Sequence, residues 1–175
     1  HTPLTLGQTS QITGFFILAL SYFIGVIPGL ASILNMYFIG FFIDFINNLG
    51  FYKTPATLLG RFSLLILGIL MIGWATYFYL KVQLGAGPRD GLMEGLVKKL
   101  KKPVWMIRGA IELTVLTIGY FLGGPVGIGT LITAFTIGFS VQLAFKIGKY
   151  DSKSAEHEDI FKMIKSFKKK EEENI

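Results

Sequence analysis

The residues best placed to do chemistry are charged side chains inside long apolar stretches. Arg108 and Glu112 lie four residues apart, so a helix through them presents both on one face. A charge near the centre of a bilayer costs about 2.5–3.5 kcal/mol on insertion scales. Two interpretations remain open. The residues form a structural ion pair whose arginine extends to the nearby membrane surface, or they line a polar cavity in which Arg108 holds an anionic group and Glu112 a cation, a proton or an amine.

A second charged pair, Arg89 and Asp90, stands in the sequence GAGPRDG at 85–91. Its glycines and proline predict a break between two helices, because proline lacks the backbone N–H that a continuous helix requires. Asp90 is suited to cap a new helix running to about Lys102, with an apolar face and a lysine face, at the membrane surface. The pair then serves in capping and headgroup contact, or it helps to bind an anion at the new helix N-terminus.

Three further polar residues are candidates for contact with a solute. Asp44 lies near the end of an apolar stretch, where it either lines a pathway or faces the membrane interface. Gln142 is the residue aligned with Asp44 in the internal repeat described below. Asn35 is better suited to a hydrogen bond between helices than to a ligand contact.

No residues stand out as candidates for catalysis. His1 and His157 are isolated, and the sequence has no cysteine, P-loop, H-E-x-x-H or Ser/His/Asp grouping. We therefore expect no enzyme activity, no metal and no cofactor. The net charge of +6 would favour nucleic acid in a soluble protein, but here the lysines flank hydrophobic segments, as in loops held against anionic lipid. Nucleic acid is not an expected partner.

The composition predicts an all-α, polytopic membrane protein. The apolar fraction is 51% and the charged fraction 16%, whereas soluble domains carry about 25% charged residues. We expect five spans: about 11–27, 31–48, 58–80 and 103–122, and a fifth that ends near residue 147. Glycines and prolines should break the helices between spans: Gly85, Gly87, Pro88, Gly123, Gly124, Pro125 and Gly127.

Lysine and arginine residues set the expected orientation. They concentrate in residues 83–102 and in the tail after Lys149, and such segments stay in the cytoplasm. We expect a transmembrane domain at 1–149 and a basic, amphipathic, cytoplasmic tail at 150–175. The lysine-rich loop and the tail should contact anionic headgroups of the bilayer, and a homodimer is compatible with these features.

The chain also contains an internal repeat. Seven residues recur 98 positions later in one ungapped window: Tyr22, Phe23, Gly25, Gly29, Ile39, Gly40 and Phe41 match Tyr120, Phe121, Gly123, Gly127, Ile137, Gly138 and Phe139. Because the lysine distribution points the two copies in opposite directions, we expect an inverted repeat with an odd number of spans per unit. Repeat two (58–149) supplies three spans and repeat one (1–48) only two, so about 60 residues with a sixth span and a second break are expected before His1.

The order of these motifs resembles the YczE/YyaS/YitT-type bacterial integral membrane proteins, and in particular the YczE-like branch. The resemblance covers about residues 8–145 and is carried by LGAGPRDGL (84–92), Arg108-x-x-x-Glu112, GGPVGIGT (123–130) and ILNMYFIGFFIDFI (33–46). It implies a multi-pass protein of the bacterial cell membrane with a further N-terminal helix and GxGPxD segment. It does not imply a substrate.

Inverted repeats, broken helices and charges within spans together favour a transporter or exporter of a small anionic or zwitterionic solute. The site would lie between the two repeat units and be formed by the polar residues named above. The alternatives are a non-transporting scaffold or regulator that acts through the tail, and a substrate-binding subunit of a multi-component transporter.

Overall fold

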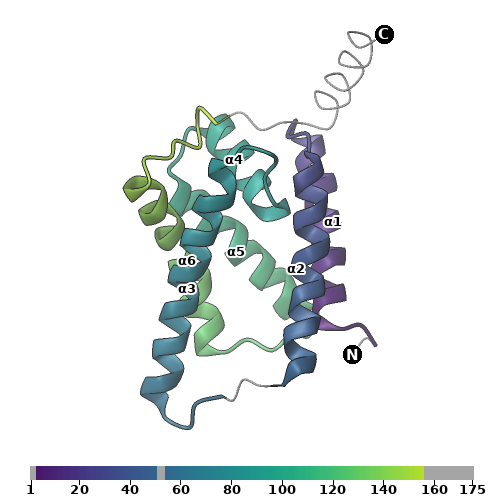
Figure 1. Cartoon of the computed structure of the whole chain (residues 1–175), viewed down its shortest axis with the longest axis vertical. Helices are drawn as coiled ribbons and strands as arrows, with labels where there is room; N and C mark the ends of the chain where they lie inside the picture. The colour runs from purple at the N-terminus through teal and green to yellow at the C-terminus, as the bar shows by residue number, and fades with distance from the viewer. Residues whose placement is uncertain (1–2, 51–53, 156–175) are drawn as a thin grey trace, which may run out of the picture. The chain divides into compact units, whose positions relative to one another are not determined.

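The computed structural model describes residues 3–50 and 54–155. Within these ranges all regular secondary structure is helical, which confirms the predicted all-α class (Figure 1). The elements are α1 (Leu6–Phe23), α2 (Leu30–Leu49), α3 (Leu58–Lys81), α4 (Pro88–Leu100), α5 (Val104–Phe121) and α6 (Ile128–Ile147). The greater part of the predicted tail, residues 156–175, lies outside the described residues.

Four helices in the described ranges are long and apolar enough to cross a membrane: α2, α3, α5 and α6. Four of the five predicted spans therefore correspond to such helices, and the first predicted span does not. The remaining long helix, α1, has 18 residues, the same number as α5. Its first turns carry four consecutive polar residues, which lower its mean hydropathy: Gln8, Thr9, Ser10 and Gln11.

The start of α1 lies five residues before the predicted one at Gln11, because Thr5 and Gln8 form a capping box. The Thr5 hydroxyl accepts the backbone N–H of Gln8 at 3.1 Å, and the Gln8 side chain accepts that of Thr5 at 3.0 Å. Each bond satisfies a donor that the first turn would otherwise leave open. The polar residues after Thr5 are thus helical.

The described chain forms two compact units. The first unit comprises residues 3–50, 82–95 and 155, and the second comprises 54–81 and 96–154. Helices α1 and α2 pack together in the first unit, whereas α6 packs against both α3 and α5 in the second. The division falls inside α4, so the segment 85–91 belongs with α1 and α2.

In the second unit α3 runs parallel to α6. Gly73 of α3 lies against Ser140 of α6. One turn further along α3, Tyr77 lies against Gly148, which follows the end of α6. The Ser140 hydroxyl donates to the carbonyl of Ile69 at 2.9 Å, and a Cβ on Gly73 would lie 2.9 Å from the Ser140 carbonyl oxygen. Close approach at small residues is how helices associate in a bilayer, where lipid is as apolar as the side chains.

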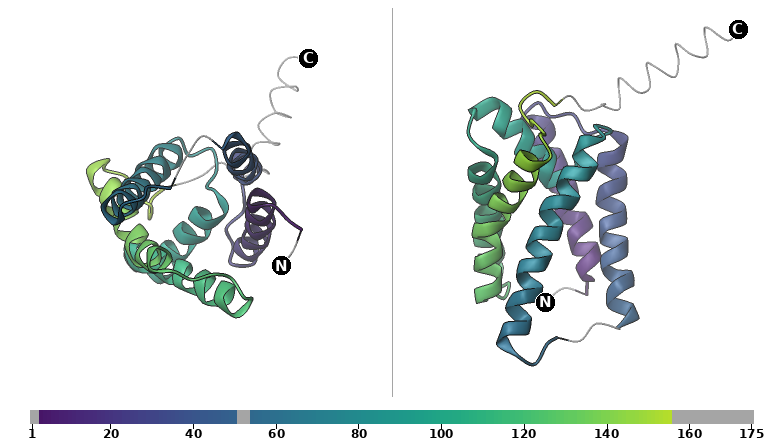
Figure 2. Two further views of the ribbon diagram at one scale, coloured as in Figure 1. Left: turned by 90° about the horizontal axis from the view of Figure 1, so that it is seen from below. Right: turned by 60° about the vertical axis from the view of Figure 1, so that its left-hand side comes forward.

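The internal repeat is reproduced in the limits of four helices. Helix α5 begins and ends 98 residues after α1, and α6 begins and ends 98 residues after α2. The connecting turns match as well, since Gly25 and Gly123 both have positive φ, at 93° and 84°. Such a conformation favours glycine. The repeated unit is therefore a pair of adjacent helices with a glycine turn, and Figure 2 shows the α1–α2 copy side by side in both views.

Candidate functional site

Arg108 and Glu112 form an ion pair within α5. Arg108 Nη2 lies 3.1 Å from Glu112 Oε1, and the two side chains are 7% and 15% exposed. The pairing agrees with the structural interpretation, but Arg108 is buried and does not extend to an exposed surface. The two residues lie in the second and third turns of a predicted span.

The pair lies largely out of solvent. The buried residues of α5 are Arg108 and three aliphatic residues, Val104, Ile107 and Ile111. A buried charge depends on partners within the protein, because little water is available to solvate it. A guanidinium also presents a planar fork of N–H donors, which matches a carboxylate or phosphate group. The arrangement can therefore hold an acidic group at Arg108 and a cationic group or proton at Glu112.

Asp44 has a defined structural role in the first unit. Its Oδ1 accepts the backbone N–H of Gly7 at 2.8 Å, and its Oδ2 accepts the hydroxyl of Thr5 at 2.5 Å. Both partners belong to the N-terminal turn of α1, where unpaired N–H groups and the helix dipole favour a negative charge. Asp44 therefore ties α2 to the start of α1.

Gln142 has the equivalent role in the second unit. Its Oε1 accepts the backbone N–H of Trp105 at 3.0 Å, in the first turn of α5. Trp105 and Gln142 are the residues 98 positions after Gly7 and Asp44. Trp105 also stacks on Phe139 of α6, with ring centroids 4.9 Å apart. The alignment of Asp44 with Gln142 thus corresponds to a shared contact between two helices.

Asn35 is half-buried on α2. No hydrogen bond involves its side chain within the part of the chain that the structure describes. The predicted interhelical hydrogen bond is therefore not observed there.

The break at 85–91 lies inside the first unit. Gly85, Ala86, Gly87 and Pro88 are all buried, and Gly85 has a φ of 134°. A Cβ on Gly85 would lie 3.1 Å from the hydroxyl of Ser32, so the chain crosses the start of α2 at close range. Glycine is required here both for its backbone conformation and for space.

One prediction about α4 was wrong. The helix begins at Pro88, so Asp90 lies within its first turn and is not the N-cap residue. Proline suits a first helical position because the missing N–H would have no partner there. The predicted apolar face of α4 packs against the protein, since Leu92, Met93 and Val97 are buried. Arg89 and Asp90 are half-buried.

Sequence reasoning missed one charged residue, Glu94, which is only 2% exposed. The available signal was its place between Met93 and Val97, on the apolar side of α4. Acidic side chains are almost never fully buried without a partner. Among the residues that the structure describes, no group of histidine, aspartate and glutamate is arranged to hold a metal ion.

The candidate residues are divided between the units. Asn35, Asp44, Arg89 and Asp90 belong to the first, and Arg108, Glu112 and Gln142 to the second. The structure brings Arg108 and Glu112 together, whereas Asp44 and Gln142 each bond to the first turn of a neighbouring helix.

Comparisons with known proteins agree with a membrane location. The sequence profile of DUF6198, a family of unknown function, matches residues 1–146. The uncharacterized membrane protein YczE of Bacillus subtilis (strain 168) is 38% identical over 147 residues, which cover 82% of this chain and 66% of that protein. An uncharacterized protein of Haemophilus influenzae is 37% identical over 119 residues, covering 68% of this chain and 54% of that protein. The chain thus spans less than two thirds of the length of these curated relatives, and no solved structure matches it.

Proposed function

Since the chain belongs to DUF6198, a family of unknown function, we propose a function from its own geometry: transport or export of a small anionic or zwitterionic solute. Its similarity to a YczE-like membrane protein and its four apolar helices establish a multi-pass integral membrane protein. Our proposal adds that this membrane protein provides a pathway for a solute.

The observation that carries the proposal is the buried Arg108–Glu112 pair. A zwitterionic solute can replace each partner, with its carboxylate on Arg108 and its ammonium on Glu112. Every charge then remains compensated, which keeps the cost of opening the pair low. An anionic solute would bind Arg108 while Glu112 took up a proton or a cation. Charged residues inside spans mark solute and ion pathways in many membrane proteins.

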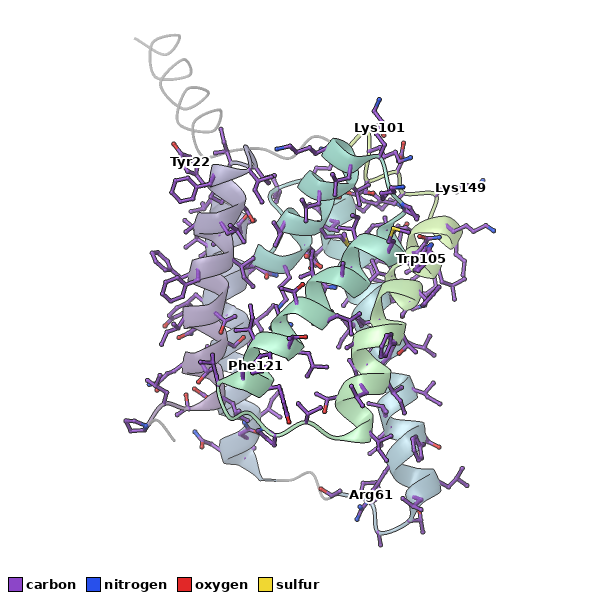
Figure 3. The ribbon with its side chains drawn as sticks, turned by 180° about the vertical axis from the view of Figure 1, so that it is seen from behind. Tyr22, Arg61, Lys101, Trp105, Phe121 and Lys149 are labelled. Carbon is purple, nitrogen blue, oxygen red and sulfur yellow. The ribbon has the colours of Figure 1, made fainter. Side chains whose placement is uncertain are left out.

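The charge distribution of the second unit supports the expected orientation. Lys101 and Lys149 lie toward one end of its helices and Arg61 lies at the other (Figure 3). Lys81 and Lys146, in the last turns of α3 and α6, add to the basic end. The excess of positive charge favours a cytoplasmic location for that end. Helix α3 then begins, at Leu58, on the outer side of the cell membrane.

An inverted repeat follows from this orientation. The connection between α2 and α3 is not helical where the structure describes it, and only a helix can take a single chain through hydrocarbon. Helix α2 therefore ends on the outer side, where α3 begins, whereas its counterpart α6 ends on the cytoplasmic side. Transporters built from inverted repeats bind solutes where the repeats meet.

A scaffold or regulator is the second candidate, and one observation favours it. The Arg108–Glu112 pair neutralises itself within one helix, so it satisfies its own charges without a solute. A purely structural pair should tolerate exchange of its two charges, whereas a binding site should not.

The test is a charge exchange in the full-length protein. The wild type and the double variant Arg108→Glu/Glu112→Arg are reconstituted in liposomes and assayed with labelled anions and zwitterions. We expect flux for at least one solute in the wild type, at least tenfold less in the exchanged variant, and similar thermal stability. Arg61→Ala is the control, because the Arg61 side chain is exposed and its Nε donates to the carbonyl of Pro55 at 2.8 Å, away from the ion pair. Absence of flux for every solute, or full flux in the exchanged variant, would contradict the proposal. If deletion of residues 151–175 then abolished the biological activity, the scaffold would be favoured.

A further inference from the structure

We propose that two uncovered surfaces of this chain are docking sites for a single segment of the intact protein, a helix followed by a glycine–proline break that precedes α1. One surface consists of Ile39, Phe42 and Ile46 on α2 and is here called the α2 face. The other is the start of α6 from Gly127 to Thr130, here called the α6 start. The inference does not depend on which solute the protein handles.

The α2 face is identified by comparison with α6. On α6, Ser140 contacts α3, and Ser140 and the residues about one turn to either side, Ile137 and Ala144, are at most 8% exposed. The residues 98 positions earlier are Ile39, Phe42 and Ile46, and their exposed fractions are 47%, 51% and 44%. On another face the copies agree, since Phe45 and Leu143 are 49% and 50% exposed. The two helices therefore differ where α3 covers α6.

The α6 start is identified in the same way from the first unit. There the break at 85–91 covers the start of α2, and Ser32 is only 1% exposed. The equivalent residue, Thr130, is exposed. The local backbone is nevertheless alike, because Gly29 N–H donates to Ser32 Oγ at 3.1 Å and Gly127 N–H donates to Thr130 Oγ1 at 2.9 Å. The two helix starts differ in what covers them and not in their own conformation.

One structural element accounts for both differences. Helix α3 and the break that follows it are consecutive, yet α3 packs on α6 in the second unit and the break packs on the start of α2 in the first. A second copy of this element would pack the other way round. Its helix would lie on the α2 face in the first unit, and its break would lie on the α6 start in the second unit. The order of the repeat puts that copy before α1. The curated relatives are long enough to supply it, because the matched residues fill only 66% and 54% of their lengths.

The same equivalence gives the proposed break a specific neighbour. Glu112 corresponds to Gly14, and a Cβ on Gly14 would lie 3.4 Å from Cγ of Pro88. The proline of the second break would therefore approach Glu112 and present the N-terminus of a helix to its carboxylate. Free N–H groups and the positive end of the helix dipole stabilise a negative charge at such a position. The segment would thus complete the surroundings of the Arg108–Glu112 pair.

The test is cysteine cross-linking in the full-length protein in its native membrane. Phe42→Cys is combined with single cysteines placed through two turns of the helix that precedes α1, and Thr130→Cys with cysteines in the break that follows that helix. Residues 1–175 contain no cysteine, so background within them is absent. The matched controls are Phe45→Cys and Phe121→Cys, whose positions are exposed in both copies of the repeat.

We expect intramolecular products with helical periodicity, several-fold more abundant for Phe42→Cys than for Phe45→Cys, and for Thr130→Cys than for Phe121→Cys. Equal or absent products at test and control positions would overturn the proposal and indicate that these surfaces face lipid. Products that join two chains, with none inside a chain, would overturn it in favour of a second copy as the occupant. The variants are on exposed positions, so loss of folding is not expected to obscure the result.

Discussion

Asp44 on α2 holds the first turn of α1 through the backbone N–H of Gly7, at 2.8 Å from Oδ1. The contact recurs in the second repeat, where Gln142 accepts the N–H of Trp105 at 3.0 Å. A carboxylate in one copy and an amide in the other make the same bond. The shared requirement is therefore an acceptor oxygen at this position, and a charge is not needed to meet it.

The first prediction follows from that equivalence. Asp44→Asn keeps an acceptor for Gly7 and should leave the melting temperature in detergent nearly unchanged, whereas Asp44→Ala removes the acceptor of the Gly7 N–H and of the Thr5 hydroxyl and should cost about 0.5–2 kcal/mol, as the loss of a capping group does. Gln142→Ala should destabilise by a similar amount. Differential scanning fluorimetry measures these shifts. Equal destabilisation by Asn and Ala at position 44 would show that the charge itself is required.

The ion pair gives a second prediction. Arg108→Ala leaves the largely buried Glu112 carboxylate without this partner, and breaking a buried pair costs about 3–5 kcal/mol. The double variant Arg108→Met/Glu112→Gln removes both charges at similar volume, so it should be more stable than the single variant. Thermal unfolding of the three purified proteins checks the order. A double variant less stable than Arg108→Ala would contradict it.

The third prediction concerns close packing within each repeat. A Cβ on Gly40 would lie 2.6 Å from the carbonyl oxygen of Gly7, and one on Gly138 would lie 2.5 Å from that of Trp105. Gly40→Ala and Gly138→Ala should each separate a helix pair and cost about 1–3 kcal/mol. Gly68→Ala is the control, because nothing lies within 4 Å of its added Cβ. Yield and melting temperature are the measurements, and unchanged values for Gly138→Ala would refute the packing argument.

A fourth prediction concerns the basic end of the second unit. The Tyr77 hydroxyl donates to the carbonyl of Gly148 at 3.2 Å and accepts from Lys81 Nζ at 2.9 Å. Tyr77→Phe should therefore destabilise by about 1 kcal/mol. Tyr120→Phe removes an exposed hydroxyl and should have no effect. The comparison is made by thermal unfolding, and indistinguishable variants would show that the Tyr77 bonds contribute nothing.

The fifth prediction tests the inverted repeat directly. Ile27 and Val126 lie in the turns of the two copies. In intact cells a membrane-impermeant maleimide should label Val126→Cys, and it should label Ile27→Cys only after the membrane is opened. Labelling of both from the same side would mean that the two copies run in the same direction.

The sequence predicted the limits of most apolar helices better than those of α1, for identifiable reasons. Apolar runs bounded by polar residues, proline or glycine placed α2, α3, α5 and the end of α6 to within a residue. The start of α1 was hidden because its capping residues precede polar turns that look like a loop. The role of Asp44 could not be predicted, since Thr5 and Gly7 are distant in sequence. Burial of Met93 and Glu94 likewise depends on the folded chain and not on their own helix.

The equal lengths of the repeated helices bear on how the protein responds to its lipids. Helices α2 and α6, both apolar enough to cross a membrane, have 20 residues each. At 1.5 Å per residue each reaches about 30 Å, close to the hydrocarbon thickness of an ordinary bilayer. Lipids with longer acyl chains would therefore leave both copies short together. Hydrophobic mismatch would act on the two halves with nearly the same weight and would give neither half an advantage over the other.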